Sequence, residues 1–154
     1  MIAVLQRIRR ASVTADGEPN GACGKGLLIL LGVGKNDAEE DARLLVEKIV
    51  NLRIFEDENG KMNLSVSVIG GEAMVVSNFT LLADYSHGHR PDYFGAARPE
   101  QAIPLYEHFV SLLSGRLSHV ATGRFGSDME VDMLSDGPVT IVMDSERLRR
   151  GRSK

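Results

Sequence analysis

The run from Gly26 to Val33, GLLILLGV, marks the centre of the expected fold because it is the longest aliphatic stretch in the chain. An apolar run of this length, without polar alternation, is typical of a β-strand that is buried on both faces. It is much shorter than the roughly 20 apolar residues that a membrane-spanning helix requires. We therefore expect a central strand with other elements packed against both of its faces.

Patterns typical of helices and of further strands surround this run. Apolar residues at helical spacing predict one helix over 37–52 and a second helix whose apolar stripe runs from Ala102 to Leu113. A turn signal at 57–60 predicts a hairpin after residues 53–56. Further strands are expected over 2–8, 11–15, 73–79 and near 118–122, 129–134 and 139–144. This order predicts an α/β fold of mixed α+β layers, in one strand-rich domain with two main helices.

Composition limits the classes of protein that the chain can belong to. Its 154 residues are 43% apolar, which predicts one globular domain with a sizeable core. A net charge of −3 argues against a protein that coats nucleic acid with a basic face, but it permits a grip on the tip of an RNA. Cys23 is the single cysteine, so no internal disulfide can form, and the N-terminus lacks a secretory pattern. We expect a cytoplasmic protein.

The C-terminal segment differs in composition from the rest of the chain. Residues 147–154 hold five of the 18 basic residues and no apolar run. We expect a domain over 1–146 that is followed by a disordered, solvated tail. The alternative is that this segment forms a weak electrostatic tether to RNA phosphates.

Two short polar segments are candidates for chemistry because each of them interrupts an apolar strand pattern. Ser77 to Leu81 follows the strand-like run 73–76, and Asp136 to Thr140 places a Gly-Pro step directly before another strand. A Gly-Pro step makes a rigid turn, and the bond before proline is one of the few that adopt the cis form. The end of a strand fixes the backbone while the following loop exposes it, which favours a functional site.

Neither segment contains a conventional set of nucleophile, base and orienting acid. Ser77 and Thr80 carry hydroxyl groups but have no base near them in the sequence, and Cys23 is best interpreted as a buried structural thiol. His87 and His89, with carboxylates close by, are a weak signal for a metal site, which stays open as an alternative. The missing catalytic set fits a substrate that provides its own reacting group.

The two segments resemble the signature motifs of the D-aminoacyl-tRNA deacylase family, which read Ser-Gln-Phe-Thr and Asn-x-Gly-Pro-Val-Thr. The matching segments are Ser77-Asn78-Phe79-Thr80 and Ser135-Asp136-Gly137-Pro138-Val139-Thr140. The similarity covers nearly the whole chain and includes residues 3–8, 55–65, 90–91 and 122–129.

The resemblance implies a β/β/α layered fold and a homodimer in which the Gly137-Pro138 loop of each chain reaches the active site of its partner. In the family this bond is cis, so both carbonyls point into the pocket. There they accept the ammonium group of a D-residue and clash with an L-side chain. Glycine has no side chain, so glycyl-tRNA mischarged on a non-cognate tRNA should also be a substrate.

The implied reaction is hydrolysis of the ester bond of D-aminoacyl-tRNA, a chiral proofreading step in translation that releases free D-amino acid and tRNA. No cofactor or metal is implied, because the 2′-hydroxyl of the terminal adenosine helps the attacking water. The expected catalytic residues are Ser77, Asn78, Phe79 and Thr80. Backbone N–H groups around Phe79 and Thr80 would bind the oxyanion, and the Phe79 ring would stack on adenine. The expected substrate-binding residues are Phe79, Gly137, Pro138, Val139 and Thr140.

The chain departs from the family motifs at two positions: Asn78 stands in place of Gln, and Ser135 in place of Asn. Asn is shorter by one methylene, so a substrate contact can be replaced by water. Because the main work is assigned to backbone groups, we expect activity to survive. The alternatives are a non-catalytic homologue that binds aminoacyl-tRNA ends or another acylated ligand, a metal-dependent hydrolase, and a structural dimer without an active site.

Overall fold

The structure, a computed structural model, describes residues 1–152 and is built on a curved six-stranded sheet. The strands of this sheet are β1 (Ile2–Ala15), β2 (Glu18–Cys23), β3 (Gly26–Gly32), β6 (Glu72–Ser77), β7 (Val120–Thr122) and β8 (Met129–Asp144). β3 lies at the centre, antiparallel to β1 and parallel to β6, and β7 continues beyond β6. Both β2 and β8 pair with β1.

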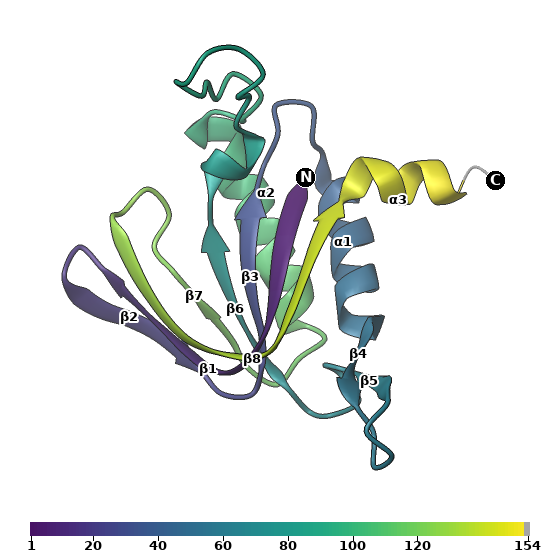
Figure 1. Ribbon diagram of the computed structural model, residues 1–154. Coiled ribbons are helices and arrows are strands. Elements are labelled where there is room, and N and C mark those ends of the chain that lie inside the picture. Colours follow the sequence, from purple (N-terminus) through teal and green to yellow (C-terminus); the bar gives the residue numbers. More distant parts are fainter. Residues whose placement is uncertain (153–154) are drawn as a thin grey trace.

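Side chains of β3 alternate between two hydrophobic clusters, which explains why this strand carries no polar residue. Leu27, Ile29 and Leu31 belong to a large core that includes the apolar faces of α1 (Glu39–Asn51) and α2 (Pro99–Ser114). Leu28 belongs to a smaller cluster with residues of β1, β2, β6 and β7. Figure 1 shows both helices against one face of the sheet, while β2 and the ends of β1 and β8 beside it curl away from them. The predicted α/β class and the central buried strand are confirmed.

The N-terminal strand and the strand before α3 (Ser145–Arg152) are each one long element, which corrects the prediction of two short strands in each segment. β1 and β8 pair antiparallel from Ile2 opposite Asp144 to Ala15 opposite Met129. The pairing register shifts between residues 6 and 8 and between residues 8 and 10 of β1, so the residues that interrupt the strand pattern lie in β-bulges. The interruptions in the sequence pattern are therefore bulges inside a continuous ladder.

The remaining predicted elements are present with small differences at their ends. The hairpin consists of β4 (Arg53–Glu56) and β5 (Met62–Ser65). β6 ends at Ser77 and is followed by a 3-10 helix, η1 (Phe79–Leu82). α1 begins at Glu39, and the Asp41 carboxylate in its first turn accepts a hydrogen bond from the N–H of the N-cap residue Ala38 at 2.9 Å. None of the helices within residues 1–152 is long and apolar enough to cross a membrane.

Helix α3 includes residues 147–152 of the expected tail, which corrects the prediction that this stretch is disordered. Contacts with distant residues support it: the buried Ser145 accepts a hydrogen bond from the N-terminal ammonium group at 2.8 Å. Arg149 also pairs with the buried Asp41 of α1 at 2.5 Å. Residues 153–154 of the expected tail lie outside the described part of the chain.

Candidate active site

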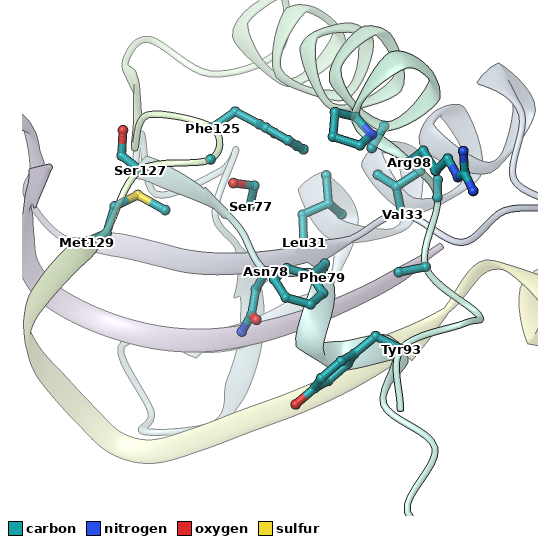
Figure 2. A pocket seen from close by; sticks show the side chains of 15 residues that line it. Leu31, Val33, Ser77, Asn78, Phe79, Tyr93, Arg98, Phe125, Ser127 and Met129 are labelled. Atoms are coloured by element: carbon teal, nitrogen blue, oxygen red, sulfur yellow. The ribbon is translucent and has the colours of Figure 1, made fainter. Parts of the chain in front are cut away.

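A pocket of about 530 Å³ opens where the parallel strands β3 and β6 end. It is lined by residues of four segments, at 31–33, 77–79, 93–102 and 125–129. Figure 2 shows Leu31, Ser77 and Phe125 around the hollow, with the guanidinium group of Arg98 turned away from Ser77. The lining is mainly apolar, so a few polar atoms can orient a ligand there.

The segment Ser77–Thr80, called here the pocket segment, is placed by close contact with β3. The Asn78 N–H donates to the Leu31 carbonyl at 2.8 Å, so the strand ladder continues one residue past β6. Gly32 lets η1 approach, because a Cβ atom at this position would lie 2.6 Å from Leu82 Cδ2 and 3.0 Å from the Asn78 carbonyl oxygen. The end of the Leu82 side chain could move away from such an atom, but the Asn78 carbonyl could be relieved only by a shift of the backbone. Contact with the backbone of β3 therefore fixes the position of the pocket segment.

The buried Tyr106 helps to hold the last part of β6 in place. The Tyr106 hydroxyl donates to the Val75 carbonyl at 2.9 Å, and the Gly123 N–H donates to the same oxygen at 3.1 Å. Burial raises the pKa of Tyr106 to about 12, so the hydroxyl remains a donor at physiological pH. Its ring also meets Phe125, a pocket residue, edge to face at 5.8 Å between centroids. Tyr106 thus supports both the strand end and one pocket wall.

The predicted catalytic residues are placed unequally around this pocket. Ser77, Asn78 and Phe79 line it, whereas Thr80 does not. The Thr80 hydroxyl donates to the Asn78 side-chain oxygen at 2.5 Å, which orients the amide from outside. Phe79 is 57% exposed, and its ring contacts Tyr93 edge to face at 5.1 Å. Phe79 and Thr80 open η1, and the leading N–H groups of a helix have no acceptor within it.

The second predicted segment lies apart from this pocket. Residues 136–140, called here the Gly-Pro loop, are not among the residues that line it. They form a bulge in β8, since Gln6 pairs with Thr140 whereas Ile8 pairs with Ser135. The Gly137-Pro138 bond is cis, as the family resemblance implies, and both residues are exposed. Within one chain the structure therefore does not bring the two predicted segments together.

A buried arginine lies beneath the Gly-Pro loop. The Arg7 Nε donates to the Asp136 carbonyl at 3.1 Å and lies 3.4 Å from a carboxylate oxygen of the same residue. Its Nη1 donates to the Ile54 carbonyl at 2.8 Å. Arg7 is only 6% exposed, so the loop rests on a charged group that is held by the body of the protein. Thr140, at the other end of the loop, donates its hydroxyl to the Gln6 side-chain oxygen at 2.6 Å.

The residues of the alternative chemistries do not gather into a site. The His87 ring lies 2.8 Å from the Ser86 hydroxyl, and His119 lies 2.9 Å from the Ala22 carbonyl. Among residues 1–152, no three His, Cys, Asp or Glu side chains cluster in a way that could hold a metal ion. Cys23 is buried, and burial followed by the charge of Glu72 raises its pKa to about 11. This supports the interpretation of Cys23 as a structural thiol.

Several pocket residues were not identified from the sequence as site residues. Tyr93 and Arg98 come from the segment before α2, and Phe125 and Ser127 come from the segment between β7 and β8. Both segments are loops without periodic patterning. The match of residues 122–129 to the family covered Phe125 and Ser127 without assigning a role to them, whereas the match at 90–91 ended before Tyr93 and Arg98.

Comparison with known proteins gives one consistent result. The family model described as D-Tyr-tRNA(Tyr) deacylase matches residues 4–144. A D-aminoacyl-tRNA deacylase of Chloroflexus aurantiacus is 56% identical over 152 residues, which are 99% of this chain and 95% of that protein. A D-aminoacyl-tRNA deacylase of Anaeromyxobacter dehalogenans is 53% identical, over 96% of this chain and 99% of that protein.

Solved structures agree with these sequence matches. The structure of a "c-Myc DNA Unwinding Element Binding Protein" has a TM-score of 0.88 and 41% identity, over 94% of this chain and 98% of that one. The structure of "a probable eukaryotic D-amino acid tRNA deacylase" has a TM-score of 0.77 over 92% of this chain and 97% of that one. At 15% identity, the second comparison shows the fold alone.

Proposed function

The chain belongs to the D-Tyr-tRNA(Tyr) deacylase family and hydrolyses the ester bond of D-aminoacyl-tRNA, and we propose that it does so in the pocket beside Ser77, Asn78 and Phe79. The observation that carries this assignment is the position of the matching motif. It lies where two parallel strands end, and three of its residues line a mainly apolar hollow. We place the reaction in the cytoplasm, where aminoacyl-tRNA is used.

Backbone groups of η1 stabilise the negative charge that develops in the reaction. Water attacks the ester carbonyl carbon, and the carbonyl oxygen becomes an oxyanion before the bond to the ribose oxygen breaks. The N–H groups of Phe79 and Thr80, which open η1, are the donors that we assign to this oxyanion. A donor of this kind contributes about 2.7–4 kcal/mol to transition-state stabilisation.

The substrate supplies the group that the pocket lacks. Among residues 1–152, no histidine, carboxylate or cysteine lines the pocket, so no side chain there can act as a general base near neutral pH. The neighbouring 2′-hydroxyl of the terminal ribose positions the attacking water in this proposal. The water proton passes to the leaving ribose oxygen, and the products are the D-amino acid and tRNA.

A second copy of the chain completes the pocket in this proposal. β8 has β1 as its strand neighbour, and its side chains Val131, Met133, Leu134 and Val142 are 38% to 65% exposed. Apolar side chains along such a strand suit a symmetric contact in which the same surface serves both partners. The exposed Gly137 and Pro138 would then enter the partner's pocket. There their carbonyls would receive the ammonium group of a D-residue or of glycine and exclude an L-side chain.

Matched D- and L-tyrosyl-tRNA test this function directly. We expect the purified protein to release D-tyrosine in the presence of a chelator while the L-ester stays intact. Release of neither amino acid would support the non-catalytic homologue, and release that stops with chelator would support the metal-dependent alternative. Sedimentation at micromolar concentration tests the dimer, because a species of 16.8 kDa alone would contradict it.

A further inference from the structure

We propose that the segment between η1 and α2, residues 83–98, is a contact surface for the single-stranded nucleotides that precede the terminal adenosine of the tRNA. The proposal rests on the function proposed above, because it extends the pocket outward along the same substrate. In Figure 1 this segment projects beyond the end of the sheet, above η1 and the start of α2.

The exposed aromatic side chains of the described chain gather in one place. The chain has three tyrosines, five phenylalanines and no tryptophan. Four of them are exposed, and they all lie between residues 79 and 94: Phe79 at 57%, Tyr85 at 80%, Tyr93 at 38% and Phe94 at 83%. Exposed aromatic rings in a group are typical of an interaction surface.

The segment is an ordered platform that can present these rings. Asp84 and Asp92 exchange two backbone hydrogen bonds of 2.9 Å, which close the loop between them. The end of the segment is anchored to the residues just after β3, since the Lys35 N–H donates to the Gly95 carbonyl at 3.0 Å and the Ala97 N–H to the Val33 carbonyl at 2.9 Å. Tyr85 follows Asp84 and Phe94 lies two residues after Asp92, so both are next to this bridge, and binding need not order the backbone first.

The segment also provides two arginines for a phosphate backbone, beside two carboxylates that keep their negative charge. Its two carboxylates serve its own turns, because Asp84 accepts from the Ser86 N–H at 2.9 Å and Asp92 accepts from the Phe94 N–H at 3.1 Å. Arg90 and Arg98 form no ion pair with an acidic residue within residues 1–152. Both arginines are exposed and remain available to phosphates.

The surface is continuous with the pocket. Tyr93 and Arg98 belong to the segment and also line the pocket, and the Phe79 ring contacts Tyr93. If the terminal nucleotide occupies the pocket, the nucleotides before it must cross a rim of the pocket, and the proposal places them on the rim formed by Phe79 and Tyr93. Aromatic rings stack on any base, which suits an enzyme that acts on many tRNAs with the same 3′ end.

Two substrates of different length test the proposal. The variants are Arg90→Ala and the double variant Tyr85→Ala with Phe94→Ala; the controls are Lys61→Ala and Met62→Ala beside the start of β5, at the opposite end of the molecule in Figure 1. Each protein is assayed with D-tyrosyl-tRNA and with the D-tyrosyl ester of adenosine, which lacks all the preceding nucleotides. Sedimentation and thermal unfolding of every variant accompany the kinetics.

We expect the double variant to lower kcat/KM for the tRNA substrate about tenfold or more, mainly through KM, and to leave the adenosine ester unchanged. Arg90→Ala should flatten the dependence of log kcat/KM on log salt concentration by about 0.7 for the tRNA substrate alone. The control variants should match the wild type with both substrates. This pattern supports a contact with the preceding nucleotides.

Three results would overturn the proposal. Unchanged tRNA kinetics would show that the surface does not contact the substrate. An equal loss with both substrates would show that the segment acts through the pocket. Altered sedimentation of the double variant would assign the aromatic rings to contact between copies of the chain. A wild-type protein that hydrolyses neither substrate would instead contradict the proposed function itself, which keeps the two failures distinct.

Discussion

The pocket segment and the Gly-Pro loop are held in place by different means. The pocket segment continues a buried strand, and its backbone is fixed by contacts with β3, namely the Leu31 carbonyl and the space beside Gly32. The Gly-Pro loop is a bulge in β8 with exposed residues at its tip, and the side chain of Arg7 lies beneath it.

This difference predicts different sensitivities to substitution. The position of the pocket segment depends on main-chain packing, so changes in its own side chains should matter less than a change that pushes on its backbone. The Gly-Pro loop has one buried side-chain support, the Arg7 guanidinium group, beside the more exposed contacts of Arg9 and Gln6, so a substitution of Arg7 outside the loop should displace it. Four substitutions test this contrast.

Arg7→Leu should have the largest effect. It removes the donor to the Asp136 carbonyl and leaves the Ile54 carbonyl without its 2.8 Å partner, at a cost of about 1–3 kcal/mol for a buried unpaired group. We expect kcat/KM for D-tyrosyl-tRNA to fall about a hundredfold, because a shift of about 1 Å in a positioning group costs that much. Steady-state kinetics and thermal unfolding measure the two effects separately.

Arg10→Leu is the matched control, since it makes the same change three residues along β1. Arg10 pairs with Asp132 at 2.8 Å, but both side chains are more than 60% exposed. An exposed pair contributes about 0–1 kcal/mol, so stability should change little. Equal activities of the two variants would show that the Gly-Pro loop does not depend on Arg7.

Gly32→Ala should have the next largest effect. The new Cβ would meet Leu82 Cδ2 at 2.6 Å, a contact that the end of this side chain can relieve, but it would also lie 3.0 Å from the Asn78 carbonyl oxygen and from Leu81 Cβ, which pushes on the backbone of the pocket segment and η1. We expect unfolding free energy to drop by about 1–3 kcal/mol and kcat/KM to fall about tenfold. Gly115→Ala is the control, because its nearest neighbouring atom lies at 3.5 Å and its φ is helical. Full activity of Gly32→Ala with lowered stability would argue against backbone positioning.

Asn78→Gln should have a smaller effect, because it restores the family side chain without moving the backbone. We expect kcat/KM to stay within about tenfold of the wild type, or roughly 1.4 kcal/mol. The Thr80 hydroxyl, now bonded to the Asn78 oxygen at 2.5 Å, must find a new acceptor in this variant. A gain above tenfold would show that Asn78 impairs the enzyme and that side chains, not backbone groups, limit the rate.

The sequence predicted those parts of the fold that depend on local pattern. The strand at 26–33, the hairpin after residue 53 and the apolar stripe of α2 follow from periodicity and turn chemistry. The continuity of β1 and β8 could not be predicted from local pattern. Each strand has an interruption in its apolar pattern, and pairing with the other strand accommodates that interruption as a bulge. α3 was missed for a similar reason, since Ser145 and Arg149 find partners at Met1 and Asp41, far away in sequence.

The candidate site was predictable where a motif marks it and unpredictable where loops assemble it. Ser77, Asn78 and Phe79 were identified from the motif, and they line the pocket. Tyr93 and Phe125 come from loops. Loops have no periodic sequence pattern that would indicate that these two residues line the same pocket. The support of the Gly-Pro loop by Arg7 joins residues 129 positions apart, which a single sequence does not reveal.

Tyr106→Phe should have the smallest effect. It tests how much the pocket segment depends on the hydrogen bond from the Tyr106 hydroxyl to the Val75 carbonyl of β6. The ring and its contact with Phe125 remain, and the Val75 carbonyl keeps the Gly123 N–H at 3.1 Å. We expect a loss of about 1 kcal/mol in unfolding free energy and a threefold or smaller fall in kcat/KM, by roughly 0.6 kcal/mol.

The pH dependence of stability tests the burial of the Tyr106 hydroxyl. Burial raises the pKa of Tyr106 from 10.0 to about 12, so the folded state favours the protonated hydroxyl. Its contribution is therefore complete below pH 10 and is lost as pH rises towards 12. Chemical unfolding of both proteins should show a constant difference up to about pH 10 and a shrinking one above it. A difference that stays constant to pH 12 would mean that the pKa of Tyr106 is not raised in the folded state, which contradicts the burial of its hydroxyl.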